Sequence, residues 1–435
     1  MANIVAIVGR PNVGKSTLFN RLIESREAIM DNESGVTRDR HYGFAEWIGK
    51  GFTVIDTGGY VHGSEDVFEE AIRNQVMYAL KEATVIIFMG DCNDGLTDLD
   101  KDFANVVRTV NKPVVVVGNK ADTNAKMQNA VEFYELGFGE VHPISSANGS
   151  GTGELLDEVV SHFHEDNSEN DEDGLPKIAI MGRPNVGKSS FVNVLIGEER
   201  SIVTDIAGTT RDAINTRYKM FGKDFLLIDT AGVRKKAKVK EDIEFYSVIR
   251  AIRALQNSDI CIVMIDAQNG LESQDINLIN LAIKYRKGIV LMVNKWNLIE
   301  KDQNTSEKFR KEIVERLGTS SYIPIIFTSV ITKQRVFKAI ETAIEVYHER
   351  YKKIPTSELN NILLKEIDRF SPPAYKGKHV KIKYITQLPT KTPAFAFFCN
   401  FPKYIKNPYS RYLENKIRAN FGLSGVPIKL VFKEK

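Results

Sequence analysis

Residues 9–16 read GRPNVGKS, and residues 182–189 read GRPNVGKS again. Both stretches fit GxxxxGK[ST], a pattern whose glycines let a loop turn its backbone N–H groups toward phosphate. Each stretch follows an apolar run, IVAIV at 4–8 and IAIM at 178–181, and precedes a segment of helical character. A strand before the loop and a helix after it is the setting in which this pattern binds phosphate. The sequence therefore predicts two nucleotide sites.

The two loops belong to a longer internal repeat. The interval that separates Gly9 from Gly182 also separates two TRD tripeptides, at 37–39 and 210–212, and the strand-end pair Asp56 and Asp229. The interval is slightly longer for two Asn-Lys pairs further along the chain, at 119–120 and 294–295. A near-constant spacing through four separate motifs indicates that a whole domain has been duplicated.

Apolar runs alternate with amphipathic segments in both copies. Runs such as VIIFMG at 85–90 and ICIVMID at 260–266 show no alternation of apolar and polar residues. This composition is typical of parallel strands that are buried on both faces. Such strands, alternating with helices, predict an α/β fold for each copy, doubly wound around a mostly parallel sheet.

The stretch between the copies, EDNSENDEDG at 165–174, holds six acidic residues and no apolar residue. It cannot bury enough surface to offset the entropy of ordering, so it predicts a flexible linker. We therefore expect one domain at 1–164, a second at 175–345 and a third, of α+β type, at 346–435.

Each copy carries residues suited to phosphate and magnesium chemistry. Lys15 and Lys188 can neutralise the β- and γ-phosphates, and a serine, a threonine and an aspartate can supply oxygen ligands to Mg²⁺. The threonine precedes Arg-Asp in a polar segment, as expected of a switch residue that ligates Mg²⁺ only beside a γ-phosphate. The predicted Mg²⁺ ligands are Ser16, Thr37, Asp56, Ser189, Thr210 and Asp229. The predicted catalytic residues are Asn12, Lys15, Thr37, Asn185, Lys188 and Thr210.

The sequence NKAD at 119–122 indicates the base that the first site selects. The carboxylate of Asp122 can accept hydrogen bonds from both N1–H and the 2-amino group of guanine, which adenine cannot offer. Short loops that begin at Ser145 and Ser329 are predicted to contact the guanine oxygen. The second copy reads NKWN, and the amide of Asn297 cannot accept twice as a carboxylate does. The base selectivity of the second site is therefore open.

The complete predicted sites follow the same motifs in both copies. The first GTP site comprises Gly9, Arg10, Pro11, Asn12, Val13, Gly14, Lys15, Ser16, Thr17, Asp56, Thr57, Gly58, Gly59, Tyr60, Asn119, Lys120, Ala121, Asp122, Ser145, Ser146 and Ala147. The second comprises Gly182, Arg183, Pro184, Asn185, Val186, Gly187, Lys188, Ser189, Ser190, Asp229, Thr230, Ala231, Gly232, Val233, Asn294, Lys295, Trp296, Asn297, Ser329, Val330 and Ile331.

The position after each DxxG motif departs from the pattern of many small GTPases, which place Gln there to orient the attacking water. Tyr60 and Val233 occupy it, and neither side chain orients water well. Asn12 and Asn185 lie inside the phosphate loops, where a side-chain oxygen can hold a monovalent cation, K⁺, against the phosphates. The alternative is that both asparagines only shape their loops.

Residues 346–435 carry no phosphate motif but are strongly basic. They contain 18 Lys and Arg against 6 Asp and Glu, a balance of +12 in a chain whose net charge is +3. This asymmetry favours a polyanionic partner for that end of the chain. The coarse pattern is helix, strand, strand, helix, strand.

Lysines and aromatic residues are interleaved in the two predicted strands of this domain. Lys378, Lys381 and Lys383 flank the first, a composition that suits RNA, whereas the phenylalanines of the next strand are equally expected in a core. A GxxG stretch at 422–425 is expected to end a helix rather than to clamp nucleic acid.

Composition excludes several other classes. The three cysteines, far apart, indicate neither a disulfide framework nor a zinc site, and no apolar run reaches the roughly 18 residues that span a bilayer. The start MANIVAIVGR lacks the basic region and cleavage site of a signal peptide. We expect a cytoplasmic monomer without membrane contact.

Together with the tail segments TSELNN, SPPAYKGKHVKIKYITQ and RYLENKIRANFGLSGVPI, these motifs resemble the Der (EngA) family, the tandem GTPases of bacterial ribosome assembly. The resemblance covers the whole chain and implies a KH-like C-terminal domain. It also implies hydrolysis of GTP to GDP and phosphate, stimulation by K⁺, and maturation of the large ribosomal subunit through contact with its rRNA. The departure is Asn297, where the family pattern has Asp.

Two other functions fit parts of the pattern. One is a tRNA-modification GTPase of the related potassium-dependent group, which would need a modification domain that the sequence lacks. The other is a nucleotide-dependent scaffold with negligible turnover, which a comparison of GTPase rates in KCl and NaCl would distinguish.

Overall fold

The computed structural model forms two compact units, residues 1–170 and 171–435, each described here by itself. It describes residues 3–27, 42–57, 76–77, 79–163, 174–197, 202–207, 214–220, 222–228, 251–300, 302–374 and 377–434. All of the predicted linker except Gly174 lies outside these residues. So do the following predicted site residues: Thr37, Gly58, Gly59, Tyr60, Thr210, Asp229, Thr230, Ala231, Gly232 and Val233.

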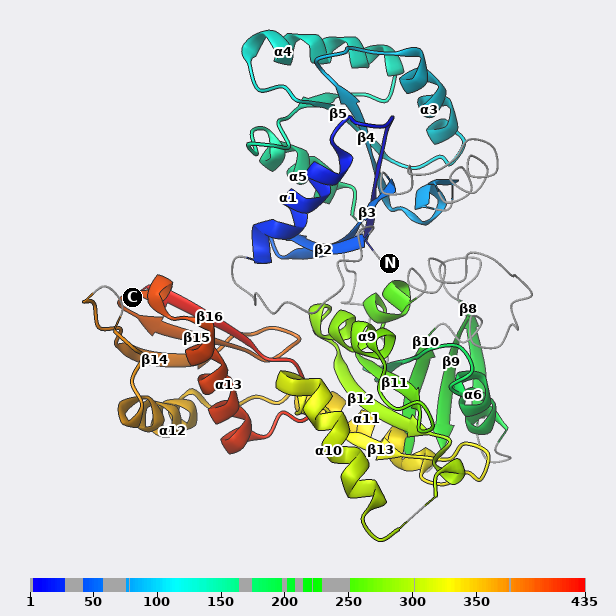
Figure 1. The fold of residues 1–435 in the computed structure, drawn as a ribbon, viewed down its shortest axis with the longest axis vertical. Coiled ribbons are helices and arrows are strands. Elements are labelled where there is room, and N and C mark those ends of the chain that lie inside the picture. The colour runs from blue at the N-terminus through cyan, green and yellow to red at the C-terminus, as the bar shows by residue number, and fades with distance from the viewer. Residues whose placement is uncertain are drawn as a thin grey trace. The chain divides into compact units, whose positions relative to one another are not determined.

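The first unit contains a six-stranded sheet in the order β2-β3-β1-β4-β5-β6 (Figure 1). Every pairing is parallel except that of β2 with β3. The strands are β1 (Ile4–Val8), β2 (Tyr42–Trp47), β3 (Lys50–Asp56), β4 (Val85–Asp91), β5 (Val114–Asn119) and β6 (Val141–Pro143). The helices are α1 (Lys15–Glu27), α3 (Asp98–Arg108), α4 (Asn124–Asn129), the 3-10 helix η2 (Ala130–Leu136) and α5 (Thr152–Ser161).

The apolar runs form the centre of this sheet because both of its faces are covered. Every residue of β1 and β4 is buried. Successive side chains of a strand point to opposite faces, and Val5 and Ile7 belong to the core that α1 and α5 close. The carboxyl ends of β1, β4 and β5 therefore meet the predicted phosphate and base motifs at one edge of the sheet.

The second unit repeats this design. Its larger sheet has the order β13-β12-β11-β7-β10-β9-β8, with parallel pairing from β13 to β10 and antiparallel pairing beyond. The strands are β7 (Lys177–Met181), β8 (Ile202–Ala207), β9 (Ile214–Met220), β10 (Lys223–Ile228), β11 (Ile260–Asp266), β12 (Gly288–Asn294) and β13 (Ile325–Phe327). The helices are α6 (Lys188–Ile196), α9 (Ser273–Lys284), η4 (Trp296–Leu298), α10 (Thr305–Leu317), η5 (Gly318–Ser320) and α11 (Val336–Arg350). The predicted duplication and doubly wound fold are confirmed.

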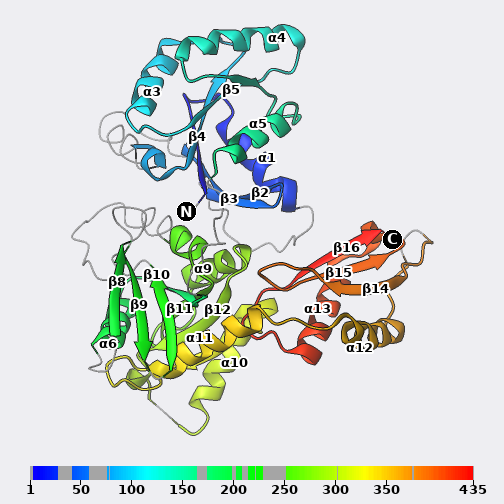
Figure 2. The same ribbon diagram turned by 180° about the vertical axis from the view of Figure 1, so that it is seen from behind.

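The C-terminal domain has three strands with two helices on one face (Figure 2). Strand β15 pairs antiparallel with β14 and parallel with β16. The elements are α12 (Thr356–Arg369), β14 (Ile382–Gln387), β15 (Ala394–Cys399), η6 (Pro402–Tyr404), α13 (Asn407–Phe421) and β16 (Lys429–Glu434). Phe395 and Phe397 are fully buried between sheet and helices, so they belong to the core and cannot stack on bases.

The GxxG stretch after α13 is an interdomain contact within the second unit. The N–H of Gly425 donates to the carbonyl of Tyr322 at 2.9 Å, and its own carbonyl accepts from the N–H of Ile289 at 2.8 Å. Leu423 and Val426 are fully buried, and Val426 joins the core of the second domain. The stretch therefore ends α13 and attaches the C-terminal domain to the start of β12.

Helix α11 runs to Arg350, past the predicted boundary at 345. The guanidinium of Arg350 is 6% exposed and lies 2.8 Å from the carboxylate of Asp259. This ion pair fixes the helix end against the strand that follows Asp259. None of the helices in the described part of the chain is long and apolar enough to cross a membrane.

Candidate nucleotide-binding sites

The two phosphate loops have the same backbone shape. Each leaves the carboxyl end of a central strand and leads into a helix, α1 or α6. A Cβ atom on Gly9 would lie 2.2 Å from the carbonyl oxygen of Met89, and one on Gly182 would lie 2.3 Å from that of Met264. Only glycine allows these close approaches. The loops therefore have the backbone geometry that a phosphate cradle needs.

The loop lysines fold back onto their own loops. The ammonium of Lys15 donates to the carbonyl groups of Gly9 and Arg10 at 2.9 and 2.7 Å, and Lys188 makes the same two bonds in the second domain. Burial lowers the pKa of each ammonium to about 8. Two carbonyl dipoles replace water only in part, so each lysine is held in place for an anionic partner.

Nucleotide binding should take up protons at pH 8. Burial lowers the pKa of Lys15 and Lys188 to about 8, and a bound phosphate should raise it again, so each site should take up part of a proton when it is occupied. Affinity for GDP should fall as the pH rises through 8, because the lysines lose their charge there. Calorimetry in buffers of different ionisation enthalpy measures the uptake. Lys188→Met should halve it, and zero uptake in the unaltered protein would contradict the expectation.

An arginine anchors each loop to the helix that follows the neighbouring strand of the sheet, α3 after β4 or α9 after β11. Arg10 lies 2.7 Å from Asp94 and 3.3 Å from Asp100. In the second domain, Arg183 bonds Asp275 at 3.0 Å and also pairs with Glu272. Asp100 and Asp275 have no exposed side-chain surface and cap the N-termini of α3 and α9. A buried carboxylate thus holds each loop in register with a neighbouring helix.

Two of the residues predicted to ligate magnesium contact one another in the first domain. The hydroxyl of Ser16 donates to the carboxylate of Asp56 at 2.6 Å, and Asp56 is 1% exposed at the end of β3. Thr57 is tied down beside it by a 2.8 Å bond to the carbonyl of Ile7. A hydroxyl and a carboxylate at the end of the phosphate loop are the oxygen donors that Mg²⁺ prefers. The residues present therefore fit the ion.

One asparagine in each domain joins the phosphate loop to the base motifs. The amide nitrogen of Asn119 donates to the carbonyl of Val13 at 2.7 Å, and its oxygen accepts from the N–H of Ser146 at 2.9 Å. Asn294 makes the corresponding bonds to Val186 and Val330 at 2.8 and 3.0 Å. Three predicted segments therefore come together in both domains.

The lysines that follow these asparagines have partners that sequence reasoning missed. Lys120 pairs with Asp91 at 2.5 Å, and Lys295 with Asp266 at 2.6 Å. Both aspartates are nearly buried at the ends of β4 and β11. Each pair fixes the position of the lysine ammonium at the carboxyl end of the strand. The interval between the two aspartates equals the interval between the two lysines, so the pairs are equivalent in the repeat.

The predicted base readers have different surroundings. Asp122 lies 2.8 Å from Lys126, and this hydrogen bond lowers the pKa of the Asp122 carboxyl. It is therefore charged at neutral pH and able to accept two donors. The oxygen of Asn297 instead accepts from the hydroxyl of Ser329 at 2.7 Å. Its amide N–H₂ remains for a base.

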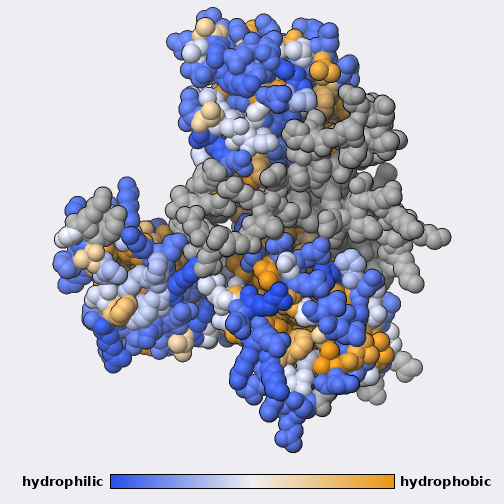
Figure 3. Space-filling view, in the orientation of Figure 1, coloured by the Kyte–Doolittle hydropathy of each residue, from blue (hydrophilic) through white to orange (hydrophobic). Residues whose placement is uncertain are grey.

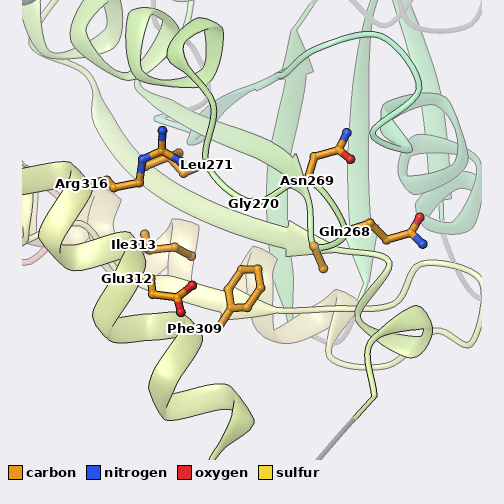
Figure 4. Close-up of a pocket in the computed structure, with 9 residues that line it drawn as sticks. Gln268, Asn269, Gly270, Leu271, Phe309, Glu312, Ile313 and Arg316 are labelled. Atoms are coloured by element: carbon orange, nitrogen blue, oxygen red, sulfur yellow. The ribbon is translucent and has the colours of Figure 1, made fainter.

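A cavity of about 250 Å³ lies between α10 and the loop after β11 (Figure 4). It is smaller than the roughly 300–1,000 Å³ typical of small-molecule sites. It contains none of the predicted site residues. Its lining consists of Ala267, Gln268, Asn269, Gly270, Leu271, Phe309, Glu312, Ile313 and Arg316.

Comparison with known proteins agrees with this geometry. A family described as "50S ribosome-binding GTPase" matches residues 4–120 and again 177–295, and "KH-domain-like of EngA bacterial GTPase enzymes, C-terminal" matches residues 353–433. Two P-loop GTPase domains before a KH-like domain define a GTP-binding protein of the tandem class. The chain is 60% identical over 435 residues to the GTPase Der of Amoebophilus asiaticus and to that of Cytophaga hutchinsonii, with 100% of each chain covered. It belongs to the GTPase Der family.

Among solved structures, the chain is similar to Era in complex with MgGDPNP and nucleotides 1506–1542 of 16S ribosomal RNA. The sequence identity is 19%, with 75% of this chain and 92% of that chain covered, and the TM-score is 0.33.

Proposed function

We propose that the chain hydrolyses GTP to GDP and phosphate at both sites and acts, as a cytoplasmic monomer, in assembly of the large ribosomal subunit. The observation that carries the catalytic part is the duplicated arrangement of a lysine bonded to its own phosphate loop and a bridging asparagine. Lys15 with Asn119, and Lys188 with Asn294, occupy equivalent places. A nucleotide-dependent scaffold would need the same binding geometry, so a comparison of GTPase rates in KCl and NaCl separates it from an enzyme.

The residues of each site divide the work of phosphoryl transfer. Loop N–H groups and the loop lysine hold the phosphates and neutralise charge that develops on them. Ser16 and Asp56, with Thr37, would hold Mg²⁺ in the first site, and Ser189, Thr210 and Asp229 in the second. When bound, the ion supplies electrostatic stabilisation of the β- and γ-phosphate oxygens.

The attacking water needs a device other than a glutamine. Tyr60 and Val233 follow the DxxG motifs, and neither can accept a proton or orient water well. We propose that Asn12 and Asn185 would hold K⁺ beside the phosphates. Both side chains are exposed at the apex of their loops, where they can reach a ligand, and the ion would supply positive charge of the kind an arginine finger gives.

Association with the large subunit is supported by the C-terminal domain. Its balance of +12 suits the phosphate backbone of rRNA, and its described surface is mainly hydrophilic (Figure 3). Lys378, Lys381 and Lys383 are all exposed. Sedimentation through sucrose gradients tests the assignment: the protein should co-migrate with the large subunit, and migration with neither subunit would refute it.

Replacing Lys378, Lys381 and Lys383 together by Ala should reduce the salt dependence of large-subunit binding. Each lost phosphate contact lowers the slope of log affinity against log salt by about 1, so the slope should fall by about 3. Substitution is preferable to deletion of 346–435, because Gly425 and Val426 pack on the second domain. Replacing Lys308, Lys311 and Lys338, exposed lysines of that domain, is the control. An unchanged slope in the first variant would contradict the proposal.

A further inference from the structure

An arginine on α1 bonds the loop that is assigned to the guanine oxygen. The guanidinium of Arg21 donates from Nε to the carbonyl of Ser146 and from Nη2 to the carbonyl of Ala147. A Cβ atom on Gly149 would lie 2.8 Å from Nη1 of the same guanidinium. The loop therefore wraps around this one side chain, and no larger residue fits at 149 without displacing it.

The loop is held from two sides. On its inner side, Asn119 accepts from both the N–H and the hydroxyl of Ser146 at 2.9 Å. On its outer side, Arg21 donates hydrogen bonds to the carbonyls of Ser146 and Ala147. When the carbonyls of 146 and 147 are fixed by a rigid fork, the peptide planes are fixed as well, and with them the N–H groups that face the base.

The second domain has a different residue at the position that corresponds to Arg21. The residue that follows its phosphate loop at the same distance is Val194, whose side chain has no donor. Val194 packs instead against the apolar cluster that includes Val330. Val330 takes the place of Ser146 in the bond to the bridging asparagine and has no hydroxyl to add a second bond. The two sites are otherwise equivalent, but they differ in the contacts that hold the loops beginning at Ser145 and Ser329.

We propose that Arg21 is a positioning residue for guanine in the first site, acting through the backbone of residues 146–147. It gives that site a hold on the guanine oxygen that Val194 cannot give the second site. The inference rests on the proposed assignment of residues 145–147 to the base. Because Arg21 is on the helix that Lys15 begins, it also ties the base loop to the phosphate loop.

Replacing Arg21 should weaken only the binding of ligands that carry a purine base. Arg21→Val in the full chain, with the second site silenced by Lys188→Ala, should raise the dissociation constant for GDP about tenfold, the equivalent of one net hydrogen bond. Inosine diphosphate keeps the 6-oxygen and lacks only the 2-amino group, so its dissociation constant should rise by the same factor. Inorganic pyrophosphate, which has no base, should bind as before. Arg21→Lys, which keeps one donor to the carbonyls, should recover part of the loss.

Two controls separate the outcomes. Asn20→Ala, at an exposed position on the same helix, should leave all three ligands unchanged. Asp122→Ala should weaken GDP more than inosine diphosphate, because Asp122 reads the 2-amino group. If Asp122→Ala raises the dissociation constant for GDP but Arg21→Val changes it less than twofold, the role of Arg21 is refuted and the proposed base site is retained. An equal loss of pyrophosphate binding would place the effect on the phosphate loop and also refute it. If Asp122→Ala has no effect, the proposed base site itself fails.

Discussion

Asn297→Asp should tighten GDP binding at the second site by about 30–1000-fold, which corresponds to about 2–4 kcal/mol. Guanine presents two donors, N1–H and the 2-amino group, to this position. The oxygen of Asn297 already accepts from Ser329 at 2.7 Å, which leaves its N–H₂ facing those donors. A carboxylate has no N–H group to oppose the two donors of guanine, and it adds a charge-assisted hydrogen bond.

Xanthosine diphosphate should show the opposite preference. It carries a carbonyl where guanine has the 2-amino group, so it matches the amide of Asn297 and is repelled by an aspartate. The measurement is titration of the full chain with GDP and with xanthosine diphosphate after the first site is silenced by Lys15→Ala. The matched control is Asp122→Asn with the second site silenced. This variant should bind GDP more weakly by a similar factor. If the unaltered second site binds GDP as tightly as Asn297→Asp does, the number of acceptors at position 297 does not set the affinity for GDP.

GTP turnover should be higher in K⁺ than in Na⁺, by about 100-fold if the ion contributes as much as one oxyanion donor does. The gain should disappear when the oxygens of Asn12 and Asn185 are removed together. The expectation follows from the lack of a water-orienting group at Tyr60 and Val233.

The backbone of the loops decides which variants can test this. Asn12 and Asn185 have φ of 66° and 63°, a left-handed conformation that asparagine and glycine accept and alanine resists. Substitution of both by Ala therefore removes the oxygen and also strains the loop. Substitution by Gly removes the side chain without straining the loop, and substitution by Asp keeps a side-chain oxygen. The K⁺ gain should be lost with Gly and kept with Asp. Equal rates in both salts for the unaltered protein would contradict the proposal.

Much of the architecture could be predicted because short motifs fix their own surroundings. The phosphate pattern at 9–16 requires a strand before it and a helix after it, and the structure has β1 and α1 there. The continuous apolar runs required a sheet covered on both faces. Because the second copy repeats the same order of motifs, the same doubly wound fold was expected of it.

The supporting residues were harder to predict because their role depends on distant neighbours. Asp91 and Asp100 resemble ordinary acidic residues, yet each has a counterpart in the second copy, at Asp266 and Asp275. Comparison of the two copies position by position would have singled them out. Arg21 has no such counterpart, since Val194 stands in its place. Only the folded chain brings it to residues 146–147.

Val426 closes the core of the second domain, although α11, the last helix of that domain, already ends at Arg350. During synthesis, the first domain can pack as soon as its own strands have emerged, since its core cluster ends at Phe163. The last contact of the second domain's core, that of Val426, forms only after α13 and the segment after it have emerged. At about 5–20 residues per second, the wait between Arg350 and Val426 lasts about 4–15 s. Over that interval the N–H of Ile289 and the carbonyl of Tyr322 lack the partner that Gly425 gives them in the folded chain.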